Sequence, residues 1–410
     1  MVKPLHPVEQ IAERLTQAEG GGVRLSRSTR VKAANSAGAA IDPVVAVFEA
    51  LAEPLDFPPL AAGIVPGDRV AIAVDRAVPC LAEVLRGALN SLQQAGVEPA
   101  DISVVTEDDQ TAELCRTIFG DKETPQIVVH APADETNLCL IGATKRGEPL
   151  LVNRTIFEAD LVIPIGCARV GAENAYDSLY PRFSSSAALE KYRSPAQREA
   201  IANRNGGRSE VDEAGWMIGV QMTVQVVPGA GECVAQVVAG EPQAVAHRSE
   251  ELCREQWLLQ SEQRVGLVIA TVTGGAQSQT WANVGRAIAA AEGVLMEEGA
   301  IAICTNLKEK PGHSLGRLVA DTNLDKVTRK VFQDHDADSW PAWHLARALQ
   351  RGPVYFMSRM NSEIVEDMGL APVDNIDDLV RLASRHESFA VLSDAQHAVV
   401  NVDDKGDERD

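Results

Sequence analysis

The chain has 410 residues and an acidic composition, with 58 Asp and Glu against 38 Lys and Arg and a formal net charge of −20. Its length predicts two domains of roughly 150 to 250 residues each, and its 45% hydrophobic residues are enough to form two cores. The negative charge argues against nucleic acid as a partner, because most of the surface would repel a polyanion.

Cysteine usage and the chain ends predict the compartment. The seven cysteines form no C-x-x-C pair, which favours reduced thiols in a cytoplasmic protein over a disulfide framework or a zinc ribbon. Residues 1–22 lack an unbroken apolar stretch, and no uncharged apolar run is long enough to span a bilayer, so we expect a soluble protein with no membrane partner. Residues 403–410 are nearly all charged and are predicted to be a disordered acidic tail.

The first half of the chain predicts a parallel sheet, after an irregular approach over residues 1–65. Strand, helix and strand follow one another at the spacing of a βαβ unit, whose ligands collect beyond the carboxyl ends of the strands. The expected elements are a helix near 42–52, a strand at 70–74, a helix at 81–95 and strands at 102–105 and 127–130.

Polar residues stand at three of these strand ends. Asp75 and Arg76 follow the first strand, an acidic run that includes Asp109 follows the second, and His130 ends the third. Each has a structural alternative: Asp75 as a helix N-cap, the acidic run as a loop that opens the next helix, and His130 as a hydrogen-bonded structural residue.

A local positive cluster lies between two further predicted strands. A turn and short strand are expected at 147–153 and a buried strand at 161–165, while Lys145, Arg146 and Arg154 lie close together in the sequence. In an acidic chain such a cluster suits a small anionic molecule or a cofactor. A solvated turn with ordinary cations explains these residues equally well.

Residues 167–207 are rich in arginine and poor in apolar residues, so we expect either a ligand-binding loop or an exposed segment. Arg76, Arg169, Arg182 and Arg204 are all expected near a ligand. An anion must offset their charge, or else nearby carboxylates such as Asp75 and Asp109 must do so. A hairpin at 219–227 and 233–240 and a long helix at 242–260 are expected next.

A second unit is predicted from residue 261, so that the domains are 1–260 and 261–402. Its first strand runs into Gly274 and Gly275, whose backbone N–H groups could approach an anion at a helix N-terminus. The expected elements are strands at 265–272, 300–305, 354–357 and 389–392, with helices at 281–298 and 374–385.

Known nucleotide and zinc motifs are absent from the sequence. It contains no G-x-G-x-x-G, no G-x-x-x-x-G-K-[ST] and no H-E-x-x-H. Asp334, His335 and Asp336 could bind a metal, although three adjacent polar residues on a loop are usually solvated. We therefore assign no metal ligand.

Three stretches resemble the nickel-dependent lactate racemase family, whose members racemise or epimerise 2-hydroxy acids. They are GATKRGEPLLVNRTIFEADLVIPIG, ECVAQVVAGEPQAVAHRSEE and TGGAQSQTWANVGRAIAAAEGVLMEEGAIAI. The resemblance extends from about residue 70 to residue 400. It implies an α/β protein of two domains, with parallel and mixed sheets and an interdomain cleft.

The family's functional residues are mostly replaced in the first domain. An Asp-x-Thr-Arg-Pro loop grips the phosphate of a nickel pincer nucleotide in the family, and only its Asp and Pro remain here, at Asp75 and Pro79. Ser178 falls near a catalytic histidine, and Ala188 falls at the lysine that bonds the cofactor. The acidic residues 107–109 replace another catalytic histidine.

The resemblance therefore implies a divergent member that binds a small anion, either a 2-hydroxy acid or a phosphate-bearing molecule. No cofactor is expected, and the nickel pincer nucleotide would bind only if the family chemistry were retained. The positions that correspond to the cofactor site are Asp75, Arg76, Arg182, Ser184, Ser185, Arg204, Gly274, Gly275, Gln277 and Arg286.

Two alternatives stay open. The chain could be an active racemase or epimerase in which Asp109, His130 or Tyr176 transfers the proton and Lys191 bonds the cofactor. It could instead be a non-catalytic partner that pairs with an active paralogue or acts as a binding subunit. A homo-oligomer is also a possible assembly.

Overall fold

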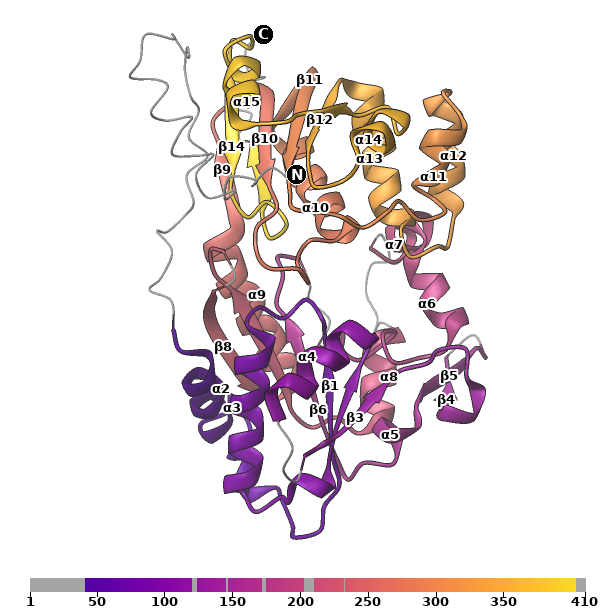
Figure 1. The fold of residues 1–410 in the computed structure, drawn as a ribbon. Coiled ribbons are helices and arrows are strands. Elements are labelled where there is room, and N and C mark those ends of the chain that lie inside the picture. The colour runs from indigo at the N-terminus through magenta and orange to yellow at the C-terminus, as the bar shows by residue number, and fades with distance from the viewer. Residues whose placement is uncertain are drawn as a thin grey trace, which may run out of the picture. The chain divides into compact units, whose positions relative to one another are not determined.

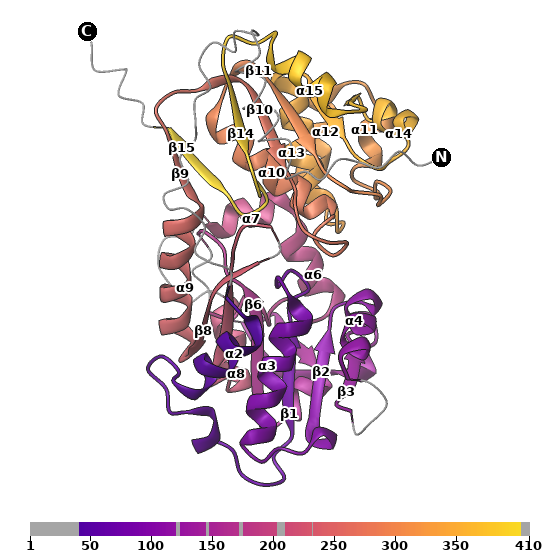
Figure 2. The same cartoon turned by 60° about the vertical axis from the view of Figure 1, so that its left-hand side comes forward.

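The structure is a computed structural model that describes residues 41–119, 124–144, 147–171, 175–202, 210–231 and 233–402. The chain folds into two compact units (Figure 1 and Figure 2). Of the described residues, the N-terminal unit holds 41–189 and 210–254 with their gaps, and the C-terminal unit holds 190–202 and 255–402. Lys145, Arg146, Arg204 and the predicted tail at 403–410 lie outside the described residues.

The N-terminal unit is built on a six-stranded sheet in the order β3-β2-β1-β6-β7-β8. Its strands are parallel except for the antiparallel pair formed by β7 and β8. The strands are β1 (Val70–Val74), β2 (Ile102–Thr106), β3 (Gln126–Val129), β6 (Leu161–Cys167), β7 (Thr223–Pro228) and β8 (Val234–Gly240).

Two helices cover one face of this sheet, α2 (Pro43–Ala52) and α3 (Leu81–Gln94). They lie side by side (Figure 1), and a Cβ on Gly87 of α3 would come within 2.7 Å of the Val44 carbonyl oxygen, so a glycine allows this close approach. Ile72, Ile163 and other aliphatic residues of the strands form the core beneath them.

The opposite face carries smaller residues. Strand alternation places Ala71, Ala73 and Gly166 on it, and the short helix α5 (Arg154–Phe157) packs on β1 and β2. The remaining elements of the unit are η2 (Leu60–Ala62), η3 (Pro99–Asp101), α4 (Asp109–Phe119), η4 (Glu135–Asn137), β4 (Leu138–Ala143), β5 (Pro149–Asn153), α8 (Glu210–Ile218) and most of α9 (Pro242–Trp257).

The C-terminal unit is built on a parallel five-stranded sheet in the order β13-β12-β11-β10-β14. A separate parallel ladder joins β9 (Leu258–Ser261) to β15 (Val399–Val402). The strands of the main sheet are β10 (Val265–Thr271), β11 (Leu295–Cys304), β12 (Val354–Met357), β13 (Ala371–Pro372) and β14 (Phe389–Leu392).

Helices cover both faces of this second sheet. One core places Val268 and Ile301 of the strands against α10 (Trp281–Val294) and α13 (Ser339–Arg351), and Trp281 stacks on Phe356 with ring centroids 5.8 Å apart. The other core places Leu267 against α15 (Ile376–Ala383). The remaining helices are α11 (Gly316–Ala320), α12 (Leu324–Gln333) and α14 (Ser362–Asp367), and α7 (Pro195–Ala202), which follows α6 (Ser186–Arg193), packs on α12 and α13.

The predicted α/β class with parallel and mixed sheets is confirmed, but the ends of two predicted helices are corrected. The helix expected at 242–260 ends at Trp257, because the next residues pair with the distant β15. The helix expected at 281–298 ends at Val294, where β11 begins. In the stretch 167–207, for which either a ligand-binding loop or an exposed segment was expected, α6 and α7 place several basic residues on helices.

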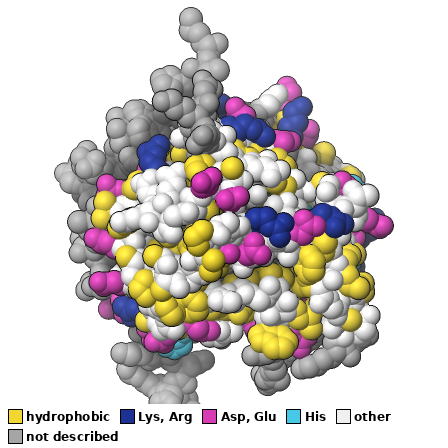
Figure 3. Space-filling view, turned by 90° about the horizontal axis from the view of Figure 1, so that it is seen from below, with side chains coloured by type: hydrophobic (Ala, Val, Ile, Leu, Met, Phe, Trp, Pro, Cys, Tyr) yellow, Lys and Arg dark blue, Asp and Glu magenta, His cyan; other side chains and the backbone are white. Residues whose placement is uncertain are grey.

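None of the described helices is long and apolar enough to cross a bilayer. The face shown in Figure 3 carries apolar side chains in small patches between acidic ones. Val65, Leu140 and Trp216, each 63% exposed, are the most exposed large apolar side chains in the part of the chain that the structure describes.

Candidate functional site

Each main sheet has a point at which its strand order reverses. In the N-terminal unit β1 lies between β2 and β6, and in the C-terminal unit β10 lies between β11 and β14. Ligands of open parallel sheets bind outside the carboxyl ends of the strands at such points. Both reversal points are therefore candidate ligand-binding sites.

Asp75 lies at the N-terminal reversal point. Its backbone N–H donates to the Ile165 carbonyl oxygen at 2.9 Å, which extends the pairing of β1 with β6 by one residue. Its Oδ1 accepts a hydrogen bond from the Ala77 backbone N–H at 2.8 Å, and its side chain is only 3% exposed. The first loop of the site is therefore fixed by a buried carboxylate.

Arg182 occupies the centre of this edge. Its guanidinium lies 3.1 Å from Asp75 Oδ2, donates to Glu107 Oε1 at 2.8 Å and to the Asp177 carbonyl oxygen at 3.1 Å. Burial lowers the pKa of Arg182, but the charges of Asp75 and Glu107 outweigh it and raise the pKa above the ordinary value. We call these four residues the Arg182 cluster.

Arg76 is also paired with an internal carboxylate. Its Nη1 lies 3.4 Å from Asp108 Oδ2, and Asp108 caps α4 by accepting from the Thr111 backbone N–H at 2.7 Å. Burial acts to raise the pKa of Asp108, but the hydrogen bonds from Thr111 and the charge of Arg76 leave it below the ordinary value. Two of the four arginines predicted near a ligand thus have carboxylate partners: Arg182 pairs with Asp75, as the alternative expected, and with Glu107, and Arg76 pairs with Asp108.

Arg169 is different. It follows β6 directly, and its Nη1 is buried with no hydrogen-bond partner among the residues that the structure describes. The same loop is tied to α9, because the Gly171 backbone N–H donates to Glu250 Oε1 at 3.3 Å. Burial raises the pKa of the Cys253 thiol in α9, and the charge of Arg169 opposes that rise.

His130 is a buried structural link in this structure. Its Nε2 lies 2.7 Å from the Ser184 carbonyl oxygen, and its Nδ1 lies 3.2 Å from the Asn153 side-chain nitrogen. These partners fit a neutral ring that donates from Nε2 and accepts at Nδ1. Burial lowers the pKa of His130, in agreement with a neutral ring. Both nitrogens are therefore occupied by protein groups.

The other two catalytic candidates lie in different surroundings. Asp109 is the exposed first residue of α4. Tyr176 is buried, and its ring lies so close to Gly215 of α8 that a Cβ there would be 2.1 Å from Tyr176 Cγ. Asp109 is thus exposed to solvent, whereas His130 and Tyr176 are enclosed by separate parts of the unit.

The two serines predicted at the cofactor site support the backbone. Ser184 is buried, and its Oγ donates to the Leu151 carbonyl oxygen at 2.6 Å. Ser185 Oγ accepts from the Ala188 backbone N–H at 3.4 Å at the start of α6. Their hydroxyls hold local structure rather than stand open to a ligand.

The C-terminal reversal point is closed by hydrogen bonds between the two strand ends. The Ala395 backbone N–H donates to the Thr271 carbonyl oxygen at 2.9 Å, and Thr273 Oγ1 bonds Asp394 Oδ1. The Thr273 backbone N–H donates to Gln396 Oε1 at 3.4 Å. All five residues are buried, so protein groups fill this crevice.

Gln279, which the sequence did not single out, holds the glycine loop after β10. Its amide nitrogen donates to the Gly274 carbonyl oxygen at 2.9 Å, and its Oε1 accepts from Thr305 Oγ1 at 2.7 Å. Gly274 has a φ of +92°, a conformation that favours glycine. The glycine is therefore required by backbone geometry, whatever binds there.

The remaining predicted residues of the C-terminal unit lie on or near this loop. Gly275 and Gln277 follow Gly274 in the turn before α10 and are half-buried. Arg286 Nη1 donates to Asn283 Oδ1 at 2.8 Å, within α10. None of them gives direct support for an anion site.

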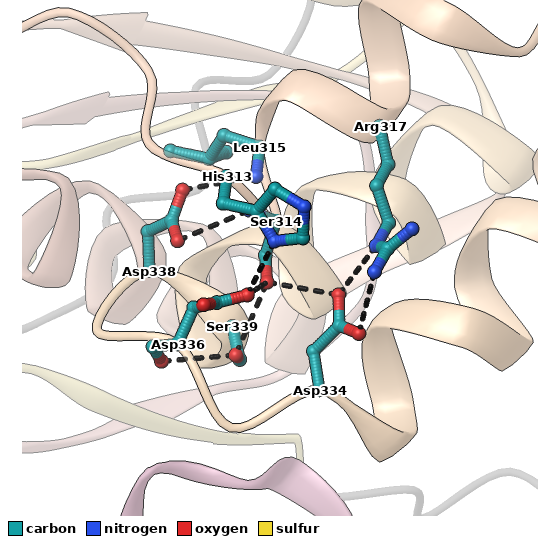
Figure 4. Close-up of polar contacts among 8 residues, drawn as sticks. All are labelled: His313, Ser314, Leu315, Arg317, Asp334, Asp336, Asp338 and Ser339. Carbon is teal, nitrogen blue, oxygen red and sulfur yellow. Dashed lines mark hydrogen bonds and ion pairs between the residues drawn. The ribbon is translucent and has the colours of Figure 1, made fainter. Parts of the chain in front are cut away.

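The acidic segment considered as a metal site is an internal hydrogen-bond network (Figure 4). Asp334 pairs with Arg317 at 2.6 and 3.0 Å, and Asp336 accepts from His313 Nδ1 at 2.8 Å. Asp338 accepts from the Leu315 backbone N–H at 2.9 Å. Ser314 Oγ lies 2.9 Å from both Asp334 Oδ2 and Asp336 Oδ2.

This network accounts for the acidic residues without a metal. The hydrogen bond from His313 keeps the pKa of Asp336 below its ordinary value. His335 contacts the Glu190 carbonyl oxygen instead of joining the carboxylates. Within the described ranges no group of three or more His, Cys, Asp and Glu side chains is arranged to hold a metal ion.

Comparison with known proteins adds a family match and two matches of fold. Residues 22–176 match the model of the lactate racemase N-terminal domain. A lactate racemase from Thermoanaerobacterium thermosaccharolyticum is 21% identical over 292 residues, which are 67% of this chain and 68% of that protein.

The solved structure of the lactate racemase apoprotein from that organism matches with a TM-score of 0.74 at 19% identity, covering 92% of this chain and 95% of the other. A Thermotoga maritima protein matches with a TM-score of 0.65 at 11% identity, covering 88% of this chain and 99% of the other. At such identities the structural matches establish the fold.

Proposed function

The chain is a lactate racemase-like protein, and we propose that it binds a small organic carboxylate, a 2-hydroxy acid being the expected type. The proposed site is the carboxyl edge of the sheet in its N-terminal unit. Arg169 is the residue proposed to hold the carboxylate, and the family's nickel chemistry is proposed to be absent.

The observation that carries this proposal is the buried Nη1 of Arg169, which has no partner in the described part of the chain. A buried donor without an acceptor costs about 1 to 3 kcal/mol, and more when the group is charged. A carboxylate matches the planar guanidinium with two parallel hydrogen bonds and offsets that cost.

The surrounding charges favour a small monoanion over a phosphate. Asp75 and Glu107 already neutralise Arg182, and Asp108 pairs with Arg76. Arg169 would balance only one of the two negative charges of a phosphate, and the other would be repelled by these carboxylates. The hydroxyl of a 2-hydroxy acid, by contrast, can donate a hydrogen bond to a carboxylate.

The residues present do not fit the nickel pincer nucleotide. Ala188, at the position of the covalent lysine by resemblance, offers a methyl group and has its backbone N–H bonded to Ser185 Oγ. Ser178, near the position of a histidine, is buried against Gly166. Arg182, which could have gripped the phosphate, is bound by two carboxylates. We therefore derive no step through this cofactor.

Protein produced together with the family's cofactor-synthesis enzymes should accordingly carry neither stoichiometric nickel nor added mass on a lysine. Elemental analysis and intact-mass measurement check this. A covalent adduct on Lys191 or Lys145 would overturn this part of the proposal.

A thermal-shift series tests binding directly. Lactate, malate and phosphate are compared at constant ionic strength, since a ligand raises the melting temperature with the logarithm of its concentration above Kd. We expect lactate, a monoanion, to raise it, and malate and phosphate, which carry about two negative charges, not to. Arg169→Gln should abolish the shift, and Arg76→Gln, on the exposed side of the same edge, should keep it. The proposal fails if no carboxylate moves the transition, or if Arg169→Gln shifts as the parent does.

A further inference from the structure

A cavity lies within the N-terminal unit, and Arg169 is not among its lining residues. Its volume is about 630 Å³, and its walls include Phe57, Tyr176, Trp216, Asp212 and Glu241. No Lys, Arg or His occurs among the lining residues that the structure describes. The cavity thus combines three aromatic rings with two carboxyl side chains.

One wall is fixed by a close backbone contact. Leu55 and Gly240 form an isolated bridge, in which the Leu55 backbone N–H donates to the Ala239 carbonyl oxygen at 2.8 Å and the Glu241 backbone N–H donates to the Leu55 carbonyl oxygen at 2.9 Å. A Cβ on Gly240 would lie 2.1 Å from the Leu55 carbonyl oxygen, so only glycine permits this approach. The bridge holds the segment that carries Phe57 beside Glu241.

The other wall is fixed by the contact of Tyr176 with Gly215. Asp212 and Trp216 are four residues apart on α8 and therefore face the same side of the helix. Trp216 is 63% exposed although it is a large aromatic side chain. A ligand that covered this indole would bury apolar surface that solvent now contacts.

We propose that this cavity binds an organic cation, of the alkylammonium class. Aromatic faces attract cations through their quadrupole, most strongly for Trp, and proteins use sites lined by several aromatic rings to recognise quaternary ammonium groups. Glu241 accepts from the Ala244 backbone N–H at 2.7 Å through Oε2, which orients its carboxyl at the start of α9. The chain's net charge of −20 further favours a cation over an anion.

Choline and its neutral isostere 3,3-dimethylbutan-1-ol have nearly the same shape, but only choline is charged. Comparing their binding therefore tests whether the cavity recognises the positive charge. Binding to the full chain is measured by calorimetry, with the fluorescence of exposed Trp216 as a second readout. Choline should bind in a saturable way and the neutral isostere at least about tenfold more weakly, because only the cation gains from the rings and carboxylates.

The variants Asp212→Asn and Glu241→Gln keep size and hydrogen-bonding capacity while removing charge. Each should weaken choline binding severalfold, and Trp216→Leu should do the same while keeping an apolar side chain. Glu98→Gln, an exposed acid that does not line the cavity, should leave binding unchanged. The inference is overturned if choline does not bind, if the isostere binds equally well, or if all variants bind choline as the parent does.

Discussion

The two reversal points share a topology but differ in chemistry. At the N-terminal one, Arg182 is enclosed by Asp75 and Glu107, and Arg169 has a buried Nη1 with no partner among the described residues. At the C-terminal one, Thr273 is bonded to Asp394 and Gln396 across the crevice. Strand order therefore indicates where a ligand could bind, and side chains decide whether space and unmatched charge remain there.

This difference assigns separate roles to the two edges. At the C-terminal edge, polar groups hydrogen-bond the end of β10 to the residues that follow β14. Substitutions there should therefore alter stability and leave ligand binding intact. Among the described residues, the N-terminal edge combines the paired charges of Arg76 and Arg182 with Arg169, whose Nη1 has no hydrogen-bond partner. Changes there should affect stability or binding according to which arginine is involved.

The largest expected effect is the loss of a partner of Arg182. Asp75→Ala removes a carboxylate that is 3% exposed and leaves Arg182 with Glu107 and the Asp177 carbonyl oxygen. Removing one partner of a buried ion pair costs roughly 3 to 5 kcal/mol, and we expect about 3 because Arg182 keeps its second carboxylate. Urea unfolding measures this loss. Asp75→Asn, which keeps an acceptor for the Ala77 N–H, should lose less; equal stability of all three proteins would contradict a structural role for the pair.

The second effect concerns the closed crevice. Thr273→Val keeps the shape of the side chain but removes the hydroxyl that hydrogen-bonds the buried side chains of Asp394 and Gln396. We expect a loss of about 2 kcal/mol in the free energy of unfolding. Lactate binding by this variant should equal that of the parent. A large change in affinity would show that the two edges are not independent.

The third predicted effect is an increase in the free energy of unfolding, where the first two are decreases. Arg169→Met removes a cation whose Nη1 is buried without an acceptor in the described structure. Ligand-free protein should become more stable by about 1 to 2 kcal/mol, because apolar replacement of an unsatisfied buried charge relieves its desolvation cost. Unfolding in the absence of carboxylates measures it. A destabilised variant would mean that Arg169 is already satisfied.

The smallest effect is a dependence of stability on pH. Burial lowers the pKa of His130 below 6.5, so the unfolded chain binds its proton more readily than the folded chain does. The contribution of the neutral ring is therefore present above pH 6.5 and is lost as pH falls toward the folded pKa. His130→Gln should flatten this part of the stability profile. His386, whose pKa burial also lowers, makes His386→Gln the matched control for the remaining slope.

Much of the fold could be predicted because its strands are buried apolar runs. The strands at 70–74, 102–105 and 161–165 were located from local pattern alone, and β1, β2 and β6 occupy these places. The pairing of β9 with β15 could not be predicted, since residues 258–261 continue a helical pattern and their partner lies far along the chain. Long-range pairing decided the end of α9.

Like the fold, the candidate site was predicted only in part, because some of its contacts join parts of the chain that are far apart in the sequence. Asp75 was proposed as a partner for the arginines, and it pairs with Arg182. Asp109 was proposed for the same purpose, but it is exposed on α4 and Glu107 takes the place at Arg182. The distinction between Arg169 and the other arginines depends on how the loop after β6 lies against α9, which no local sequence pattern reveals.

The most direct test is a calorimetric titration of lactate into three proteins at constant ionic strength: the parent chain, Arg169→Met and Thr273→Val. If the carboxylate is held at the N-terminal edge, the parent and Thr273→Val will bind with the same affinity and Arg169→Met will give no heat of binding. Equal binding by the parent and Arg169→Met, or none by the parent, would contradict the proposed role of Arg169.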